Sequence, residues 1–467
     1  MPSAPHAPRP QLTPATPPTT VTRRALGRLS VAPPLAGALA AFGIVSCAPG
    51  ERAPTPSRGP VEIKLSSWNY RTDLVRENLN VFEQQNPDIK VIGPEDGPSG
   101  DPYRDRLNTQ FLAGEALDAV YLRDEDVAEW AEAKWIRPLD DMPGSKDLEK
   151  DEYPFVREQT HYKGKRYGTI YYVGPQVYMY NKEHLREAGE SKPPETYDAL
   201  RDLALSLKRQ RVAEFPFWGA PSESLVEVAY QASGKRFFDS QLNALFGKDV
   251  LFRDIVEWHY RSYAGDQVFG TKDGVQDAHD NGFSTFAWGS FYDLKRKNGF
   301  ALGGRGEKWG DAAGQLINGV NPSFVKGQTG GPGVVRQYAV AASSKHPREA
   351  WRLIAYLGGN DKNGQYATAK NWWMLAGLGY GYKPLSEDPE IKADAAKWGD
   401  LAAYQKVLVA AQPRAGIEGP WSTLWRKEFE ASIKVAMQGK ITAKESIEQG
   451  VTVWNTMRDD FRRTHGQ

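Results

Sequence analysis

The sequence predicts an α/β protein built as two doubly wound lobes, and three observations lead to this prediction. The chain has 467 residues, too many for one ordinary hydrophobic core and suited to two units of about 200 residues each. From residue 61 onward, short apolar strands alternate with amphipathic helices, which is the pattern of a parallel sheet covered by helices on both faces. Hydrophobic residues make up 40% and charged residues 25% of the chain, the balance of a globular protein.

The charge and the cysteine content exclude several classes of protein. The formal charge is +1, but residues 1–46 hold four arginines and no acid, which leaves −3 for the rest. A nucleic-acid-binding protein needs a basic stripe, so we expect no nucleic-acid partner. The single cysteine, Cys47, permits neither an intrachain disulfide nor a cysteine-based metal site. No two histidines have the spacing of a helical metal pair and no phosphate-binding loop occurs, so we expect no metal and no cofactor.

Residues 1–47 have the pattern of an export signal. Two adjacent arginines precede a short apolar run that ends at Ser46-Cys47, which is typical of a secretory signal and compatible with the twin-arginine route as well as the general one. The stretch Ile44 to Cys47 resembles the lipobox of bacterial lipoproteins, which implies that Cys47 becomes lipidated. The alternative is a single-pass anchor, but the run is short and contains two prolines. Residues 48–60, with four prolines, are expected to form a flexible tether.

The first elements after the tether place polar side chains at strand ends. Apolar patterns predict strands over 61–68, 89–92 and 117–122, with helices over 74–85, 103–113 and 127–134. Doubly wound sheets bind ligands beyond the carboxyl ends of their strands. The segments Trp68-Asn69-Tyr70 and Arg123 to Asp126 follow two such ends and are therefore candidate binding residues. The acids at 124–126 would otherwise cap the next helix, which needs only one of them.

Residues 163–189 carry five tyrosines around a Gly-Pro pair. The pattern predicts a strand over 167–172, a break at Gly174-Pro175, a second strand over 176–180 and a helix from Asn181. Tyrosine combines a flat apolar face with a hydroxyl, which suits a wet cleft or a crossover between lobes. The alternative is an ordinary pair of sheet strands, because tyrosine favours strands.

The rest of the chain continues the alternation and becomes mainly helical. Helices are predicted over 197–208, 222–233, 249–263 and 348–357, and strands within 280–288 and over 336–342. Thr196 is expected to cap the first of these helices. The glycine-rich segment 299–333 is expected to form loops with short strands.

Six loose motifs stand in a fixed order along the chain: Asn86 to Val91, Asp118 to Asp140, Gly164 to Lys182, Pro194 to Leu200, Ser344 to Trp351 and Gly439 to Ser446. Together they resemble the extracellular solute-binding proteins of ABC importers, in the maltose- and oligosaccharide-binding class. Each motif is weak alone, but the order is specific, and the resemblance covers about residues 61–456.

The resemblance implies the type II periplasmic-binding-protein fold, with two lobes joined by hinge strands that close on a ligand. The first lobe would take 61–173 and 289–334, and the second 174–288 and 335–467. The implied protein is not an enzyme. It is a monomer that binds a sugar or oligosaccharide and delivers it to the transmembrane subunits of an ABC permease. It would be exported and held by its lipid at the outer face of the cell membrane, or be periplasmic.

The resemblance also implies where ligand contacts fall. By position these residues are Trp68, Asn69, Asp124, Glu125, Tyr172, Trp218, Trp288, Phe291, Trp373 and Trp421, with Arg305 and Trp309 in the glycine-rich segment. The chain departs from the family at the second hinge strand, so the stacking ring there is either Trp288 or Phe291. It also has Gly174-Pro175 where a carboxylate is frequent. Trp372 and Trp373 would point opposite ways if extended, so at most one of them is expected to stack on ligand.

Two other functions stay open at this point. The same fold could bind a different solute, such as a polyamine, a phosphodiester or a ferric ion, the last because Tyr171-Tyr172 offers paired phenols. A secreted glycoside hydrolase would need two carboxylates across a cleft, which no motif marks. The 14 tryptophans favour a carbohydrate ligand, because flat rings stack on sugar faces.

Overall fold

The computed structural model describes residues 59–68, 72–94, 99–270, 284–298, 315–361 and 363–466. All of these residues belong to one compact unit, residues 58–467. Among the predicted functional residues, Cys47, Asn69, Arg305 and Trp309 lie outside the described ranges. Within those ranges, no helix combines the length and hydropathy needed to cross a bilayer.

The first sheet has six strands. They are β1 (Val61–Ser66), β2 (Ile89–Ile92), β3 (Ala119–Arg123), β6 (Thr169–Pro175), β10 (Gly331–Val340) and β11 (Ala411–Gln412). Strands β2, β1 and β3 are parallel, β10 runs antiparallel to β3, and β6 runs antiparallel to β10. The short β11 pairs in parallel with the start of β10. This sheet therefore begins with the predicted parallel order and closes with two antiparallel strands.

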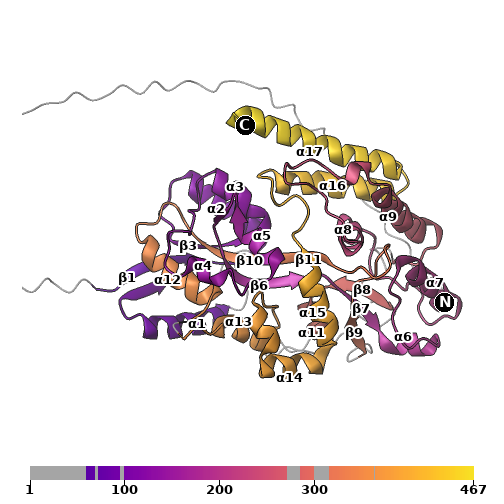
Figure 1. The fold of residues 1–467 in the computed structure, drawn as a ribbon, viewed down its shortest axis with the longest axis horizontal. Helices are drawn as coiled ribbons and strands as arrows, with labels where there is room; N and C mark the ends of the chain where they lie inside the picture. The colour runs from indigo at the N-terminus through magenta and orange to yellow at the C-terminus, as the bar shows by residue number, and fades with distance from the viewer. Residues whose placement is uncertain are drawn as a thin grey trace, which may run out of the picture. The chain divides into compact units, whose positions relative to one another are not determined.

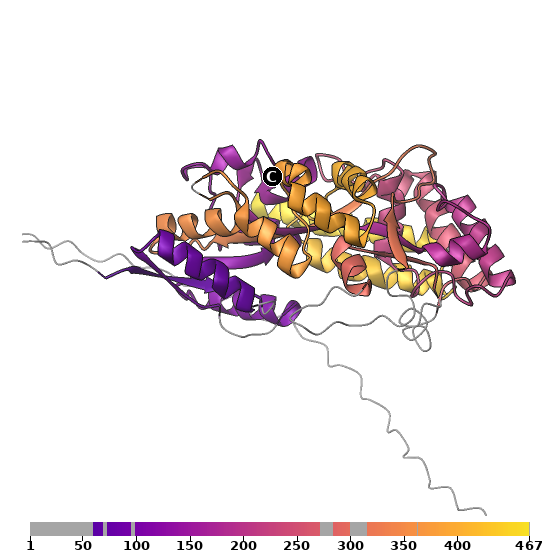
Figure 2. The same cartoon turned by 90° about the horizontal axis from the view of Figure 1, so that it is seen from below.

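Helices cover both faces of the first sheet (Figure 1). They are α1 (Thr72–Gln85), α2 (Asp101–Leu112), α3 (Val127–Glu132) and α12 (Pro347–Gly358). Helices α1 and α12 lie side by side (Figure 2), and both contribute buried side chains to the core of the sheet. The apolar run of β3 is buried on both faces, as expected for a central strand.

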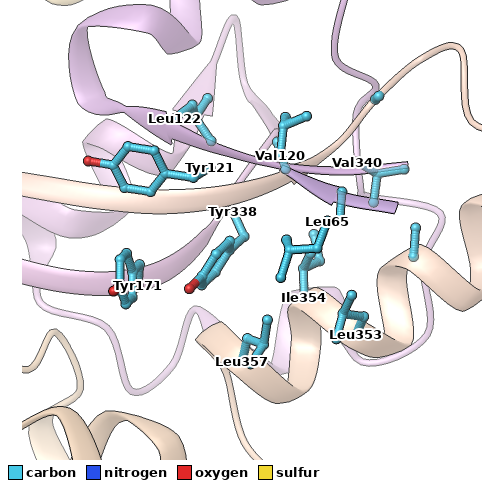
Figure 3. Close-up of a cluster of buried hydrophobic side chains, with 14 of the residues drawn as sticks. Leu65, Val120, Tyr121, Leu122, Tyr171, Tyr338, Val340, Leu353, Ile354 and Leu357 are labelled. Carbon is cyan, nitrogen blue, oxygen red and sulfur yellow. The ribbon is translucent and has the colours of Figure 1, made fainter. Parts of the chain in front are cut away.

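The core of the first sheet joins strands that are distant in sequence. Leu65 of β1 and Val340 of β10 lie over Leu353 and Leu357 of α12, next to the phenol rings of the neighbouring strands (Figure 3). Burying a leucine side chain contributes roughly 1.5–3 kcal/mol. This packing therefore fixes β10 and α12 to the first sheet, although they follow the second sheet in the sequence.

The second sheet has three strands, with β7 (Val177–Asn181) between β8 (Phe286–Gly289) and β9 (Leu316–Gly319), all antiparallel. The helices of this half are α6 (Lys182–Glu187), α7 (Tyr197–Arg209), α8 (Glu223–Ala232), α9 (Val250–Tyr260), α16 (Ser422–Met437) and α17 (Ala443–His465). The aromatic-rich core of this half contains buried side chains from all six helices, including Leu185 of α6, Tyr197 of α7 and Trp454 of α17. Thr196 caps α7 by accepting a hydrogen bond from the Ala199 amide, which confirms that prediction.

A third cluster of buried side chains joins the two sheets. It contains Ile170 and Val173 from β6 together with Val177 and Met179 from β7. The helices around it are α5 (Pro154–Thr160), α11 (Phe291–Lys297), α14 (Pro389–Trp398) and α15 (Leu401–Ala410). The chain therefore crosses from one sheet to the other between β6 and β7, where the tyrosine-rich segment predicts a crossover.

The predicted position of the break between the two strands is wrong. The strand does not break at Gly174-Pro175, because β6 continues through both residues and pairs with β10 as far as Pro175. The interruption falls at Gln176, whose amide donates to the Pro332 carbonyl instead of extending the ladder. A proline at the last position of a strand removes only one ladder hydrogen bond, which explains why the pair is tolerated.

The predicted division of segments between lobes also differs from the observed sheets. Strand β9, placed in the first lobe by the prediction, pairs with β7 of the second sheet. Most of β10 and all of α12, placed in the second lobe, belong to the core of the first sheet. The chain thus returns to the first sheet through β10, and glycine-rich loops before β10 gave no sequence signal for this return.

Candidate ligand-binding site

A cavity of about 390 Å³ lies at the carboxyl end of β3. One wall consists of the turn after β3, the start of α3, the end of α5, and the hairpin of β4 (His161–Tyr162) and β5 (Lys165–Arg166). The other wall consists of loops 240–242 and 413–421 with the end of α17. A larger groove of about 870 Å³ lies between α1, α12 and the loop 137–143, but its lining comes from the first sheet's side only. The smaller cavity, in contrast, occupies the edge of the sheet where doubly wound proteins bind ligands.

The acidic turn that follows β3 forms one side of this cavity. Asp124 and Glu125 are both buried. Arg336 of β10 lies with its Nη1 atom 2.6 Å from Asp124 Oδ1 and 3.3 Å from Glu125 Oε2. Arg414 of the 413–421 loop reaches the same pair, with its Nη1 atom 2.9 Å from Glu125 Oε2. Two arginines from different parts of the chain thus compensate two buried carboxylates.

Asp126 is the third acid of the turn. It has the capping role that was expected as the alternative function of these acids. Asp126 accepts a hydrogen bond of 3.1 Å from the Arg123 amide, and it pairs with Arg104 of α2 at 2.5 Å. It therefore caps the turn and leaves Asp124 and Glu125 available for another function.

The two available carboxyls differ in their affinity for a proton. Burial and the neighbouring charge of Glu125 raise the pKa of Asp124 to about 7, against the opposing effect of the two arginines. Burial also acts on Glu125, but Arg414, Arg336 and a hydrogen bond from Asp124 outweigh it and hold the pKa of Glu125 well below its ordinary value. The pair therefore titrates close to neutral pH, and its proton, when present, resides on Asp124.

Three residues that line the cavity have a buried polar atom without a hydrogen-bond partner among the described residues. These atoms are Asp124 Oδ2, Gln159 Oε1 and Trp421 Nε1. A buried polar group that lacks a partner costs about 1–3 kcal/mol. Two acceptors and one donor gathered at one cavity indicate a polar ligand that both donates and accepts hydrogen bonds.

The opposite wall is held in place by indole rings. Gly416 has a φ of +82°, and a Cβ atom there would lie 2.9 Å from the Trp425 ring. Trp454 of α17 donates a hydrogen bond of 2.7 Å to the Leu242 carbonyl in the neighbouring loop. The amide of Ala415 donates to Glu227 Oε1 of α8 at 2.5 Å. The 413–421 loop therefore has a fixed path across the second core.

Glu418 stands in this loop and is exposed in the cavity. The cavity walls partly desolvate its carboxyl and, together with the negative charge of Glu158 and Glu227, raise its pKa to about 7. Glu158 itself pairs with Arg236 at 3.0 Å. Both walls of the cavity thus carry a carboxyl that ionises close to neutral pH.

Among the predicted site residues, Asp124 and Trp421 line the cavity. Glu125 lies beside Asp124 and pairs with Arg414. The Tyr172 hydroxyl is hydrogen-bonded to Arg336, which also pairs with Asp124. Trp68 packs on Tyr121 of β3, with ring centroids 5.4 Å apart. The acidic turn, the crossover and the first strand end therefore lie close to one another, and their contact with a ligand stays a prediction.

The other predicted aromatic residues lie outside the lining of this cavity. Trp288 packs in the second core, with its ring parallel to Tyr197 at 6.4 Å. Trp218 packs against the third cluster. Phe291 and Trp373 are fully buried and stack on one another at 5.1 Å. Their contact with a ligand stays a prediction.

The pair Trp372-Trp373 does not have the extended backbone on which the prediction depended. The two residues begin a tight helical turn, Trp372–Ala376. Trp372 packs in the first core and Trp373 in the third cluster, so both are buried. The assumption of an extended backbone is therefore wrong, and the expectation that at most one of the two rings stacks on ligand stays a prediction.

Sequence reasoning missed much of the second wall. The cavity residues that it did not identify include Gln159, His161, Tyr162, Glu418, Phe461 and Arg462. Arg336 could have been identified from the sequence, because an arginine stands in a mostly apolar strand. Glu418 could not, since it is one acid in a loop rich in glycine and proline.

With this geometry in place, comparison with known proteins identifies the class. The chain matches the bacterial extracellular solute-binding protein family over residues 68–364. It belongs to this family, whose members are solute-binding proteins rather than enzymes. The glycoside-hydrolase alternative is therefore set aside.

Solved structures with the same fold include several sugar-binding proteins. The sugar-binding protein MalE from Xanthomonas citri has a TM-score of 0.71 at 19% identity and covers 87% of this chain and 100% of its own. The maltose-bound MalE3 of T. maritima has a TM-score of 0.69 at 17% identity, with 85% and 100% covered. The cyclic α-maltosyl-1,6-maltose binding protein from Arthrobacter globiformis has a TM-score of 0.71 at 14% identity, with 86% and 100% covered.

A curated relative is similar in sequence over a shorter length. An uncharacterized lipoprotein in the oleD 5′ region of Streptomyces antibioticus is 26% identical over 227 residues, which are 45% of this chain and 48% of the relative. The chain thus spans about half the length of the curated relative that it matches.

Proposed function

We propose that the protein captures a sugar or a short oligosaccharide in the cavity beside the acidic turn and delivers it to the transmembrane subunits of an ABC permease. The observation that carries this proposal is the set of three buried polar atoms without partners, on Asp124, Gln159 and Trp421. A hydroxyl group both donates and accepts a hydrogen bond, so a ligand rich in hydroxyls can satisfy the two acceptors and the one donor.

The aromatic lining supports the same class of ligand. Trp421, Tyr162 and Phe461 all line the cavity, and they come from both walls. Each sugar ring has apolar C–H faces, which pack favourably on flat aromatic side chains. A cavity of about 390 Å³ is near the lower end of the usual range for ligand pockets, roughly 300–1,000 Å³, which favours a short saccharide.

The charges around the cavity favour a neutral ligand over the other solutes. Glu158 pairs with Arg236, Lys163 pairs with Glu132, and the two acids of the turn face two arginines. Glu418 and Arg462 complete the lining with one charge of each sign. A polyamine would require an excess of acids and a phosphodiester an excess of bases, and neither excess is present among these residues.

The paired tyrosines do not form one metal-binding face. Tyr171 is buried in the first core among Tyr121, Tyr338 and Trp372, whereas Tyr172 is bonded to Arg336. Within the described ranges, no group of three or more His, Cys, Asp or Glu side chains could hold a metal ion. A ferric ion is therefore the least supported of the alternative ligands.

Export and anchoring form a second part of the proposal. The arginine pair, the apolar run and the lipobox-like Ile44 to Cys47 support a cleaved signal and a lipid on Cys47. The curated relative is itself named a lipoprotein. We place the mature protein as a monomer at the outer face of the cell membrane, tethered by residues 48–60.

A thermal-shift screen tests the ligand class. The panel contains maltose, D-tagatose and D-mannitol as neutral carbohydrates, with spermidine, glycerophosphocholine and ferric citrate as the alternative solutes. A ligand at 100 times its dissociation constant adds about 2.7 kcal/mol of stability, so a specific binder raises the melting temperature clearly. We expect the shift with a carbohydrate. A shift with one of the other three solutes alone, or with none of the six, would overturn the proposal.

A further inference from the structure

We infer that Glu418 is a specificity-determining ligand contact, and that it and Asp124 hold hydroxyl groups of one saccharide from the two walls of the cavity. This inference rests on the proposed function, because it concerns the same site. It adds a residue that neither the sequence motifs nor the family resemblance identifies, and it names what that residue selects.

The first argument is the position of Glu418. It lies between Ile417 and Pro420, which also line the cavity, and three residues before Trp421. Its loop packs on the second core through Ala415 and Trp421. Asp124, in contrast, follows β3 of the first sheet. The two carboxyls therefore reach one cavity from different parts of the fold.

The second argument is that Glu418 has no structural task. Within the described part of the chain, no other side chain forms an ion pair or a hydrogen bond with its carboxyl. The carboxyl is hydrogen-bonded to the backbone of Glu418 itself. The nearby Glu158 differs, because it is paired with Arg236. A carboxyl that is held in a rigid loop and faces a cavity without a partner is available to a ligand.

The third argument is the matching atom on the other wall. The side chain of Asp124 is fully buried, and its Oδ1 atom is occupied by Arg336. Its Oδ2 atom has no partner among the described residues. Asp124 and Glu418 thus each place a carboxyl among the residues that line the cavity, and both carboxyls ionise close to neutral pH.

These two carboxyls predict a definite selectivity. An ionised carboxylate only accepts hydrogen bonds, so each one requires a hydroxyl donor on the ligand. A site built to bond a hydroxyl discriminates strongly against an analogue that lacks it, because a buried polar group is then left unpaired. Glu418 should therefore select saccharides that have a hydroxyl opposite the one held by Asp124.

The test measures affinity by calorimetry for the carbohydrate that gives the largest thermal shift in the panel above. We expect Glu418→Gln to weaken binding about 10- to 100-fold, because a hydrogen bond to a charged group is replaced by one to a neutral amide. Glu428→Gln is the matched control, since Glu428 is exposed on α16 and lies away from the cavity. The melting temperatures of the unliganded variants verify that both are folded.

A second measurement separates a direct contact from a general charge effect. Monodeoxy analogues of the same sugar are titrated against the wild type and Glu418→Gln. One analogue should bind weakly to the wild type and lose little further affinity in the variant, because the bond is already absent. If all analogues lose affinity equally in the variant, or if Glu418→Gln binds the parent sugar as the wild type does, the inference is wrong. If the wild type binds no carbohydrate at all, the proposed function itself has failed.

Discussion

The wall that carries Asp124 is the end of a strand in the first sheet, whereas the wall that carries Glu418 is a loop between β11 and α16. The first wall is held by ion pairs: two arginines face two buried acids. The second is held by indole rings and a glycine in the left-handed region. The comparison shows that ion pairs hold one wall of this cavity in place, whereas aromatic packing holds the other.

Among the changes that distinguish the two walls, Arg336→Ala should cause the largest loss of unfolding free energy. This change leaves Asp124 and Glu125 with one arginine instead of two in a buried environment. Breaking a buried ion pair from one side costs about 3–5 kcal/mol, and the Arg336 side chain is only 14% exposed. Urea denaturation measures the loss of unfolding free energy.

Arg236→Ala provides the control for this first prediction. Arg236 also pairs with an acid that lines the cavity, but the Arg236 and Glu158 side chains are 54% and 42% exposed. Exposed pairs contribute roughly 0–1 kcal/mol. Equal losses in the two variants would mean that buried charge does not hold the first wall.

The difference between the walls also explains what the sequence could predict. The acidic turn was identified because it follows an apolar strand, and the carboxyl end of a strand is a recurrent binding position. Thr196, Asn181 and the helix that each precedes were likewise set by local side-chain chemistry. These features depend on neighbours in the sequence.

The features that the sequence did not reveal depend on distant contacts. Arg414 reaches Glu125, and Glu418 lines the cavity, only because the loop 413–421 packs on Trp425 and Trp454. The place of β10 in the first sheet depends on its pairing with β3, some 200 residues away in the chain. No local pattern encodes either arrangement, since both arise from packing between separate elements.

The second prediction concerns the wall that packing positions. Gly416→Ala should destabilise the protein by about 2–3 kcal/mol, because alanine is disfavoured by roughly 1–2 kcal/mol in the left-handed region and the new methyl group would overlap the Trp425 ring. It should also weaken carbohydrate binding, because the loop that carries Glu418 must shift. Thermal denaturation and calorimetry measure the two effects.

Gly189→Ala is the matched control for this change. Gly189 has the same φ of +82°, but nothing lies within 4 Å of the position that a Cβ atom would take. It should therefore show only the backbone part of the cost and no change in affinity. If Gly416→Ala is no more harmful than Gly189→Ala, then contact with Trp425 does not fix the loop.

The third prediction is a pH dependence to which both walls contribute. Asp124 faces Glu125, Arg336 and Arg414, and burial raises its pKa to about 7. Glu418 faces Glu158, Glu227 and Arg236, and its surroundings raise its pKa to about 7 as well. Hydroxyl donors favour the ionised carboxylates, so affinity should be full above this pH and should fall as the pH drops through it.

Between pH 8 and pH 6 we expect a loss of about tenfold for each carboxylate that binds the ligand, or about 1.4 kcal/mol. Calorimetry across this range measures the slope. Glu418→Gln should retain only the part of the slope that Asp124 contributes. An affinity that is flat across the range in the wild type would show that the ligand does not bind the ionised carboxyls.

The smallest effect should come from the single donor among the three unpartnered atoms. Trp421→Phe keeps an aromatic face at the cavity but removes the buried Nε1–H group, which has no partner among the described residues. If that group donates to a ligand hydroxyl, the loss of one neutral hydrogen bond should weaken binding by about 1 kcal/mol, roughly fivefold. Without ligand, the variant should lose little stability, because the small cavity left by the smaller ring is offset in part by the removal of an unpaired buried donor. A variant that loses stability but binds the sugar normally would assign Trp421 to the core alone, and the second wall would then contact the ligand through Glu418 without it.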